Sequence, residues 1–362
     1  MGERYPRLEI NLAHLKHNVS KVVEKCGAAG IQVAGVIKGA TGLPEVAKAF
    51  DEGGAAFLAS SRLEQLEDAR NAGIRKPMML IRIPMLSEVE DVIRLTDISL
   101  NSELAVIRKL NEEAARQNKL HKIILMADMG DLREGYWDKE EMTDAAELIE
   151  KELEHIQLIG IGTNLGCYGS IAPTVEKLEE LVAAAEHIEE RLGRRLEYIS
   201  GGATSSLMRV WDGNMPPRIN LLRVGEGILL ARDLDVFYGY DMSELYQDVF
   251  RLKAEVIEVK TKPSHPVGTI AIDAFGHTPT YVDRGMRKRA LLAIGKVDYA
   301  DPAELLPREK GIEILGASSD HTIVDIEDAE KDYQVGDIME FDICYATLVF
   351  LTNCRNVKIA YV

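Results

Sequence analysis

The feature that most constrains the fold of this chain is a regular alternation of short apolar strands with helical segments. Apolar segments recur eight times between residues 31 and 223, and charged segments with helical periodicity separate most of them. The predicted strands cover residues 31–38, 55–61, 77–82, 98–101, 122–129, 157–164, 196–200 and 219–223. Alternating strands and helices form parallel sheets, and eight such units close into a barrel. The sequence therefore predicts an α/β fold built on a (β/α)8 TIM-type barrel.

The pattern changes from Gln247 onward. Residues 250–259 alternate between apolar and polar side chains, residues 269–272 are rich in β-branched residues, and further short strands are predicted near residues 291, 312, 323 and 338. Turns rich in Pro, Gly and Asp separate them, which is typical of an all-β domain. We expect the barrel to span residues 1–244 and a C-terminal β domain to span residues 245–362, within the usual range of domain sizes.

Composition excludes several classes of partner. The net charge is −16 and no dense Lys/Arg tract is present, which argues against nucleic acid and against an anionic membrane surface. No apolar segment reaches membrane-spanning length, and residues 1–6 lack the apolar core of a signal peptide. The four cysteines have no metal-type spacing and imply no disulfide framework. We expect a cytoplasmic protein that acts on a small molecule without a metal site.

Lys38 ends the first predicted strand, directly after Val36 and Ile37. Barrel enzymes carry out their chemistry at this end of the strands, and partial burial would favour the neutral amine that forms Schiff bases. The alternative is a lysine that merely extends into solvent. Polar side chains also follow the other strands: Ser60, Ser61, Arg82, Asn101, Asp128, Arg133, Asn164, Ser200, Thr204 and Arg223. Together they predict a polar pocket that faces Lys38.

Two small-residue loops predict an anion site in this pocket. Residues 200–206 (SGGATSS) follow the seventh strand, and residues 223–227 (RVGEG) follow the eighth. Small residues let backbone N–H groups approach an anion, and barrels often bind phosphate at these two loops. A phosphate site opposite a lysine is what pyridoxal phosphate (PLP) needs. Arg223 would then lie where it can face the pyridine nitrogen of PLP.

The chain resembles the alanine-racemase-like, fold-type III PLP enzymes, and most closely their ornithine racemase branch. The resemblance covers nearly the whole chain and rests on the combination of motifs at residues 36–42 (VIKGATG), 128–135 (DMGDLREG), 162–169 (GTNLGCYG), 200–205 (SGGATS), 220–226 (NLLRVGE) and 316–321 (GASSDH).

This resemblance implies roles for individual residues. It makes Lys38 the Schiff-base lysine and the base on one face of the substrate, and Arg223 the partner of the pyridine nitrogen. The expected cofactor-binding residues are Lys38, Ser200, Thr204, Ser205, Arg223, Gly225 and Glu226. Arg133 matches a pocket arginine, and Asp320 matches an acidic residue that the partner subunit contributes. The family is dimeric, so the resemblance implies a homodimer whose β domains complete each other's active sites.

The chain also departs from alanine racemases. Gly42 replaces a tyrosine, Asn164 replaces a histidine, and Lys296 stands where the tyrosine that serves as second base is expected. Lys296 is therefore the first candidate for the second base, with Tyr299, Cys344 and Tyr345 as alternatives.

These features predict a two-base racemase of a diamino acid, ornithine first and lysine second. Loss of the aromatic ring at Gly42 would make room for a longer side chain. An excess of acids near the predicted site would suit a terminal ammonium: Asp128, Asp131, Glu134, Asp298 and Asp320. Three other functions remain open: a fold-type III decarboxylase of a basic amino acid, which Cys344 favours and Arg223 disfavours; a non-catalytic PLP carrier; and a class I aldolase that uses Lys38 without PLP.

Overall fold

The computed structural model describes residues 3–273, 275–276 and 278–362, and the chain divides into two compact units. The barrel unit is Leu12–Gln247, and the β unit comprises the residues up to Asn11 together with Asp248–Val362. The division after Gln247 lies close to the expected boundary after residue 244. The first eleven residues, which we assigned to the barrel, belong to the β unit because strand β1 (Arg7–Ile10) pairs with two of its strands.

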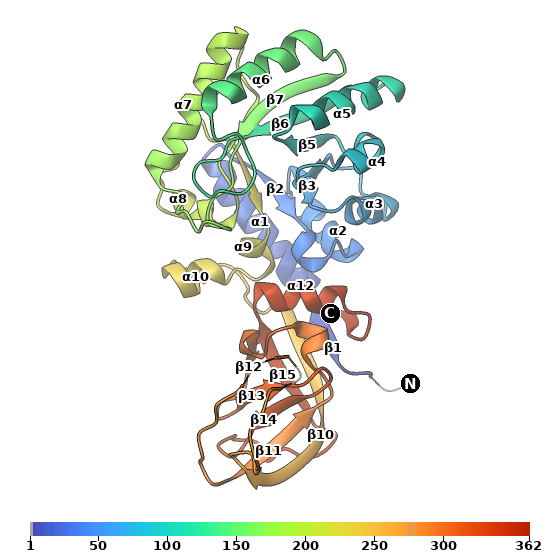
Figure 1. Cartoon of the computed structure of the whole chain (residues 1–362), viewed down its shortest axis with the longest axis vertical. Coiled ribbons are helices and arrows are strands. Elements are labelled where there is room, and N and C mark those ends of the chain that lie inside the picture. The colour runs from blue at the N-terminus through green and yellow to red at the C-terminus, as the bar shows by residue number, and fades with distance from the viewer. Residues whose placement is uncertain (1–2, 274, 277) are drawn as a thin grey trace. The chain divides into compact units, whose positions relative to one another are not determined.

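Eight parallel strands close the barrel in chain order, which confirms the predicted (β/α)8 architecture (Figure 1). They are β2 (Gln32–Val36), β3 (Phe57–Ser60), β4 (Met78–Leu80), β5 (Ile98–Asn101), β6 (His121–Met126), β7 (Ile156–Gly162), β8 (Tyr198–Ser200) and β9 (Leu221–Val224). Closure is direct, because β2 pairs with both β3 and β9.

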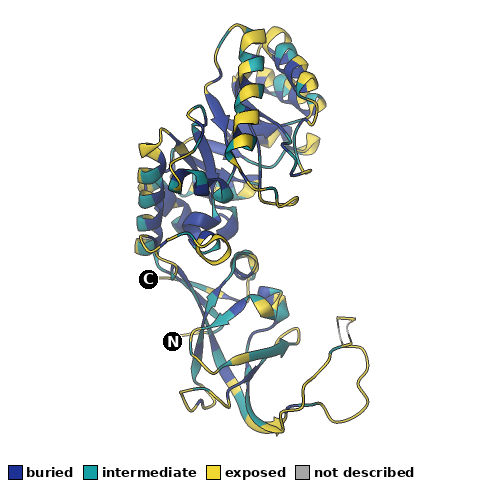
Figure 2. Cartoon of the chain, turned by 90° about the vertical axis from the view of Figure 1, so that its left-hand side faces the viewer, coloured by how far each residue is buried: buried dark blue, intermediate teal, exposed yellow. Residues whose placement is uncertain are grey.

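Helices cover the outer surface of the barrel. They are α1 (Leu12–Ala28), α2 (Pro44–Glu52), α3 (Leu63–Asn71), α4 (Val89–Leu95), α5 (Leu104–Arg116), α6 (Lys139–Glu152), α7 (Val175–Leu192), α8 (Leu207–Trp211), α9 (Glu226–Leu229) and α10 (Asp233–Tyr238). The long helices are amphipathic: α7, for example, buries Leu178, Leu181, Ala185 and Ile188 at helical spacing. Figure 2 shows the result, with buried strands and exposed outer helix faces.

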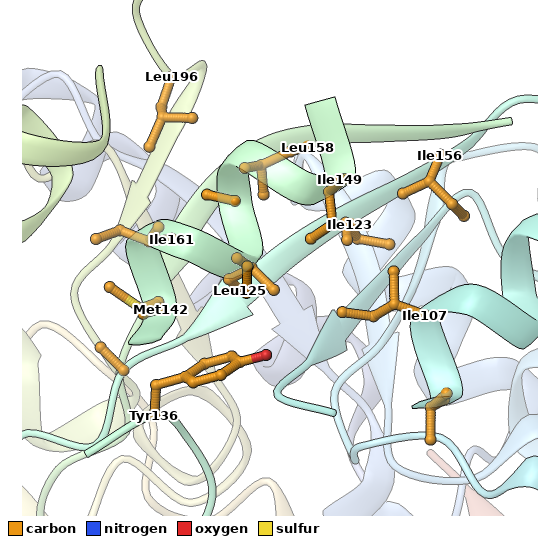
Figure 3. Packing of buried hydrophobic residues seen from close by; sticks show 14 of the residues in the cluster. Ile107, Ile123, Leu125, Tyr136, Met142, Ile149, Ile156, Leu158, Ile161 and Leu196 are labelled. Carbon is orange, nitrogen blue, oxygen red and sulfur yellow. The ribbon is translucent and has the colours of Figure 1, made fainter. Parts of the chain in front are cut away.

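Two apolar clusters hold this unit together. The larger lies between strands and helices, and Figure 3 shows Leu125 and Ile161 packed against Met142 and Ile149 of α6. The smaller contains Val36, Leu100 and Met126 among its members and fills the inside of the barrel. Full burial of each such side chain contributes roughly 1.5–3 kcal/mol. The barrel is therefore a packed core, and chemistry is confined to its polar ends.

The β unit is a mainly antiparallel sheet in the order β12-β15-β10-β11-β14-β13, and β1 pairs antiparallel with β10 and parallel with β16. Its other elements are β10 (Phe250–Pro263), β11 (Met286–Leu292), β12 (Leu305–Pro307), β13 (Glu313–Ala317), β14 (Thr322–Asp325), β15 (Ile338–Ile343), β16 (Lys358–Tyr361), α11 (Lys296–Tyr299) and α12 (Tyr345–Asn353). The strand expected at residues 269–272 was wrong, because these residues lie in the connection between β10 and β11 and pair with no strand. No helix in the described part of the chain has the length and apolar character needed to cross a membrane.

Candidate active site

Lys38 lies immediately beyond β2. The N–H group of Ile37 still bonds to the carbonyl of Ala59 in β3 (2.9 Å), and Lys38 then opens a 3₁₀ turn that ends at Ala40. Its side chain is half-buried. Burial is the main reason that the pKa of Lys38 is lowered, and the nearby positive charges of Arg133 and Arg223 lower it further. The strand end therefore holds an amine that loses its proton more easily than an exposed lysine does.

Arg223 joins three neighbouring strand ends. It comes from β9, is 4% exposed, and donates from Nη1 to the hydroxyl of Ser200 in β8. Its Nη2 donates to the carbonyl of Thr163, directly after β7 (2.7 Å). Burial lowers the pKa of Arg223 to about 10, so the guanidinium stays charged at neutral pH. The Thr163 hydroxyl is buried and has no hydrogen-bond partner in the structure. An unpaired donor beside a fixed cation is a place where a polar ligand group can bind.

The loops after β8 and β9 approach each other closely. The N–H group of Gly227 donates to the hydroxyl of Thr204 (3.0 Å), and a Cβ atom at Gly227 would lie 3.0 Å from the Thr204 methyl group. Ser205 donates its hydroxyl proton to the carbonyl of Leu165 in the loop after β7 (2.8 Å). The hydroxyls of both residues thus tie neighbouring loops together, in agreement with a compact backbone cradle.

The side chain of Glu226 is used within the barrel unit. Its Oε1 accepts bonds from the N–H groups of Arg232 and Asp233 (3.1 Å each), while its Oε2 is buried without a partner. Burial, followed by the charge of Asp233, raises the pKa of this carboxyl to about 7. Only the backbone of Glu226, next to Gly225 at the start of α9, is therefore left for the expected role at an anion.

The loop after β6 is held rigidly. Asp128 Oδ1 accepts from the N–H groups two and four residues further on (2.8 and 3.1 Å). Tyr136 forms a β-bridge with Ala127, and Lys139 Nζ donates to three loop carbonyls at 2.8–3.0 Å. Gly135 has φ +129°, and a Cβ atom there would lie 2.4 Å from the Asp128 nitrogen. Only glycine fits this return of the chain.

This loop presents Arg133 and Glu134 as an ion pair. Arg133 donates from Nε and Nη2 to the two carboxylate oxygens of Glu134, and from Nη1 to Cys167 Sγ (3.0 Å). Cys167 belongs to the loop after β7, and Asp131 fixes that loop by accepting from the N–H groups of Cys167 and Tyr168 (3.2 and 3.1 Å). Arg133 and Glu134 both act electrostatically on Lys38 and on Arg223. The structure therefore brings the predicted residues Lys38, Arg133 and Arg223 together.

Several residues of the expected polar rim do not join this cluster. Ser60 bonds to Gln65, Arg82 pairs with Glu88, and Asn101 donates to Ser99 in a buried network. These are local structural contacts.

The interpretation of Gly42 as a source of space was wrong. Gly42 has φ +71°, and a Cβ atom there would lie 2.4 Å from the Cβ atom of Gln65. Gln65 already occupies the space that a side chain at position 42 would need.

In the β unit, Lys296 and Asp320 lie in adjacent segments. The N–H group of Lys296 bonds to the carbonyl of Ser318, two residues before Asp320 (3.0 Å). Lys296 Nζ lies 3.8 Å from the centroid of the Phe275 ring. Tyr299 is fully buried and shares a hydrogen bond with Thr322 (2.6 Å), and burial raises its pKa to about 12. Its contacts make it a structural residue and remove it from the alternatives for a second base.

Sequence reasoning assigned no role to Thr163 or Cys167. Both lie in the quoted 162–169 motif, and both contact an arginine of the cluster. Their position after β7 was the available signal, because β7 lies beside β6, whose following loop carries Arg133, and neighbouring parallel strands place their following loops side by side.

The barrel fold and the half-buried lysine at its strand ends define a barrel enzyme with an appended β unit. Residues 10–233 match the model of the family described as alanine racemase, N-terminal domain, and the chain belongs to this family. Enzymes of this family and fold use PLP.

The chain is 42% identical to the ornithine racemase of Acetoanaerobium sticklandii over 345 residues, which cover 95% of this chain and 96% of that protein. It is 41% identical to the lysine racemase of Thermotoga maritima, with 95% of both chains covered. The crystal structure of alanine racemase from the D-cycloserine producer Streptomyces lavendulae superimposes with a TM-score of 0.77 at 19% identity, covering 99% and 98% of the two chains. At this identity the likeness establishes the fold alone.

Proposed function

We propose that this chain is a PLP-dependent racemase that interconverts the L and D forms of a diamino acid, with ornithine as the first candidate. The half-buried Lys38 at the end of β2, whose pKa is lowered by burial and by the charges of Arg133 and Arg223, carries the proposal. The chain's similarity to an ornithine racemase and a lysine racemase along almost their whole lengths supports the choice of substrate.

The residues present fit PLP. Lys38 offers an amine whose lowered pKa favours bond formation with an aldehyde. The close approach of Thr204 and Gly227 brings two loops of small residues together, as a phosphate cradle requires. Ser200, Ser205, Gly225 and the backbone of Glu226 belong to the same two loops. Arg223, fixed and charged, can only donate, so it suits an unprotonated pyridine nitrogen.

In this proposal Lys38 takes the Cα proton on one face of the substrate and returns a proton there in the reverse direction. PLP, when bound, withdraws electrons from the substrate and so acidifies that proton. Because inversion removes a proton from one face and returns one to the other, a second base is required. Each base should contribute roughly 10²–10⁴-fold to the rate. Lys296 remains our candidate for the second base, with Cys344 and Tyr345 as alternatives.

We propose that the protein is a homodimer in which Lys296 and Asp320 of one subunit complete the site of the other. Exposed large apolar side chains in the segments that follow the barrel strands support a partner surface: Met85, Leu86, Leu132, Trp137 and Tyr168, together with Val236, Phe237 and Tyr238 of helix α10. Apolar surface gathered in this way is typical of interaction sites. We also propose a cytoplasmic location, which fits four cysteines whose spacing implies no disulfide framework.

The test is to incubate purified protein with PLP and single L-amino acids and to separate the products by chiral chromatography. We expect D-ornithine to form fastest, D-lysine more slowly and D-alanine slowest. Release of carbon dioxide without D-product would instead indicate a decarboxylase. Absence of any product, with PLP retained, would indicate a carrier.

A further inference from the structure

We propose that Glu134 binds the side-chain ammonium of the substrate and so sets the preference for a diamino acid. This inference rests on the proposed function and narrows five acidic candidates to one residue. The choice follows from the contacts of the carboxylates, from the charges around Lys38 and from the rigidity of the loop that carries Glu134.

Three of the five acids are already used to hold backbone in place. Asp128 caps its own loop, and both oxygens of Asp131, which is 2% exposed, accept N–H bonds from the loop after β7. Asp298 is 5% exposed and accepts bonds from Gly295, Cys354 and Asn356 within the β unit. Moving any of these carboxylates to a ligand would break contacts that fix a loop. Asp320 is exposed and accepts a bond from the neighbouring Ser319 hydroxyl (2.6 Å).

Glu134 also has one side-chain partner and spare capacity, and unlike Asp320 it is partly buried and acts electrostatically on Lys38. Both of its oxygens accept N–H groups of Arg133, and each carboxylate oxygen can accept a second bond. Its side chain is 18% exposed, so it is partly desolvated yet still open to a ligand. An ammonium bound to Glu134 would join the Arg133–Glu134 ion pair as a third charge. The negative charge of Glu134 would offset the positive charge of Arg133.

The charges around Lys38 require such an acid. Arg133 and Arg223 bring two cationic groups to the end of the barrel that holds Lys38, where an approaching ammonium would be repelled. Burial and the charge of Arg133 lower the pKa of Lys38, whereas the charge of Glu134 raises it. The charge of Glu134 also raises the pKa of Arg223. Among the described residues, Glu134 is the carboxylate that acts on both Lys38 and Arg223. It therefore lies within electrostatic reach of the reacting lysine.

The loop fixes the reach of this carboxylate. Gly135 is packed against the end of β6, and Lys139 holds three loop carbonyls, so the backbone at Glu134 cannot shift without losing several contacts. A carboxylate in a fixed position selects for the length of the substrate side chain, because the donor–acceptor distance of a hydrogen bond can vary by only a few tenths of an ångström. We therefore expect Glu134 to distinguish ornithine from the longer lysine.

The experiment compares ornithine, lysine and the uncharged isostere norvaline in three forms of the holoenzyme: the parent, Glu134→Gln and Glu134→Asp. Glu134→Gln keeps the shape and an acceptor for Arg133 but removes the charge. The ratio of kcat/KM for ornithine to that for norvaline should fall by about ten- to hundredfold, the usual worth of a hydrogen-bonded charge contact. Glu134→Asp keeps the charge one methylene further back, so it should shift the preference from ornithine towards lysine.

Glu140→Gln is the matched control, because it removes an exposed carboxylate from the nearby start of α6, where Glu140 pairs with His187 and Arg191. Its ratios should equal those of the parent. Dissociation constants for ornithine and norvaline, measured by absorbance titration of the holoenzyme, supply a readout that does not depend on turnover.

An ornithine-to-norvaline ratio that stays unchanged in Glu134→Gln, in kcat/KM and in Kd, would overturn the assignment of Glu134 while leaving the racemase intact. A parent enzyme that binds ornithine but produces no D-ornithine would overturn the proposed function, and the Kd ratio would still decide the role of Glu134. A folded Glu134→Gln protein that loses affinity for both ligands equally would assign Glu134 to the support of Arg133 and not to the ammonium.

Discussion

Lys38 owes its lowered pKa first to burial and then to the charges of its neighbours. Two arginines act on it, and each is held by a contact that it cannot easily leave: Arg133 by Glu134 and Cys167, Arg223 by Ser200 and the Thr163 carbonyl. Positive charge that cannot move away disfavours a further proton on the amine. The same arrangement explains why a buried arginine is tolerated, since its N–H groups are paired with oxygen atoms.

The first prediction is that Lys38 binds PLP covalently. Protein incubated with PLP should show the yellow absorbance of a lysine-bound cofactor, and borohydride should fix the cofactor mass on the peptide that contains Lys38. Lys38→Ala should abolish both the label and turnover, whereas Lys296→Ala should lose turnover and keep the label on Lys38. A label on another lysine would contradict the assignment.

His121 should make the barrel unit sensitive to acid. It is 3% exposed and bonds to Ser99 (Nε2 to Oγ, 2.9 Å), and burial lowers its pKa to about 4 from an ordinary 6.5. Between pH 6.5 and 4 the unfolded chain therefore binds more protons, so stability is complete above 6.5 and is lost as the pH falls towards 4. The loss should be about 3 kcal/mol.

Urea unfolding followed by tryptophan fluorescence measures this effect, because both tryptophans, Trp137 and Trp211, lie in the barrel unit. His121→Gln should flatten the fall in unfolding free energy between pH 7 and 4. His321→Gln, which changes an exposed histidine of the β unit, should leave the slope as in the parent. A slope in His121→Gln as steep as that of the parent would assign the acid sensitivity to other groups.

At the scale of elements, the loop after β6 does the most to shape the site. Its fixed return at Gly135 decides where Arg133 and Glu134 lie. Gly135→Ala should cost roughly 3 kcal/mol or more, because it combines a left-handed φ with a backbone clash, and it should reduce ornithine turnover through displacement of Arg133.

Gly193→Ala is the control for this substitution. Gly193 ends α7 with φ +69°, but a Cβ atom there meets nothing within 4 Å, so the cost should be only about 1 kcal/mol with turnover retained. Chemical denaturation and initial rates of both variants make the comparison. Equal losses in the two variants would mean that conformation, and not packing against Asp128, decides the cost at Gly135.

The strands and helices of the barrel could be predicted because their signal is local: apolar segments of strand length alternate with helical periodicity. The segment 269–272 shows the limit of that signal. Its Thr and Ile residues favour a strand, but a strand also needs a partner, and partners are set by the whole sheet. The same limit applies to the site. Lys38 and Arg223 could be proposed from their positions at strand ends, whereas nothing in the sequence reveals that Asp128 Oδ1 and both oxygens of Asp131 accept backbone N–H groups.

At the scale of the whole molecule, the proposed chemistry is distributed over two units. The barrel supplies Lys38, Arg133, Glu134 and Arg223, while Lys296 belongs to the β unit. Within the β unit, the backbone bond from Lys296 to Ser318 keeps Lys296 close to the segment that carries Asp320, so the unit can present both groups together. In the proposed homodimer each subunit therefore contributes one base to each of two sites, and this division of labour can be tested without knowing the geometry of the interface.

The last prediction is complementation between two inactive variants. Lys38→Ala and Lys296→Ala should each be inactive as homodimers, because every site lacks one base. In a mixed dimer one site lacks both lysines, whereas the other combines Lys38 of one subunit with Lys296 of its partner and is intact. Random assembly makes about half of the dimers mixed, so co-expression should restore about one quarter of the parent activity. Differently tagged subunits, purified in two affinity steps, should reach about one half. Mixed dimers that form and remain inactive would show that both lysines act from the same subunit. Lys296→Ala homodimers with parent activity would show instead that Lys296 is not the second base.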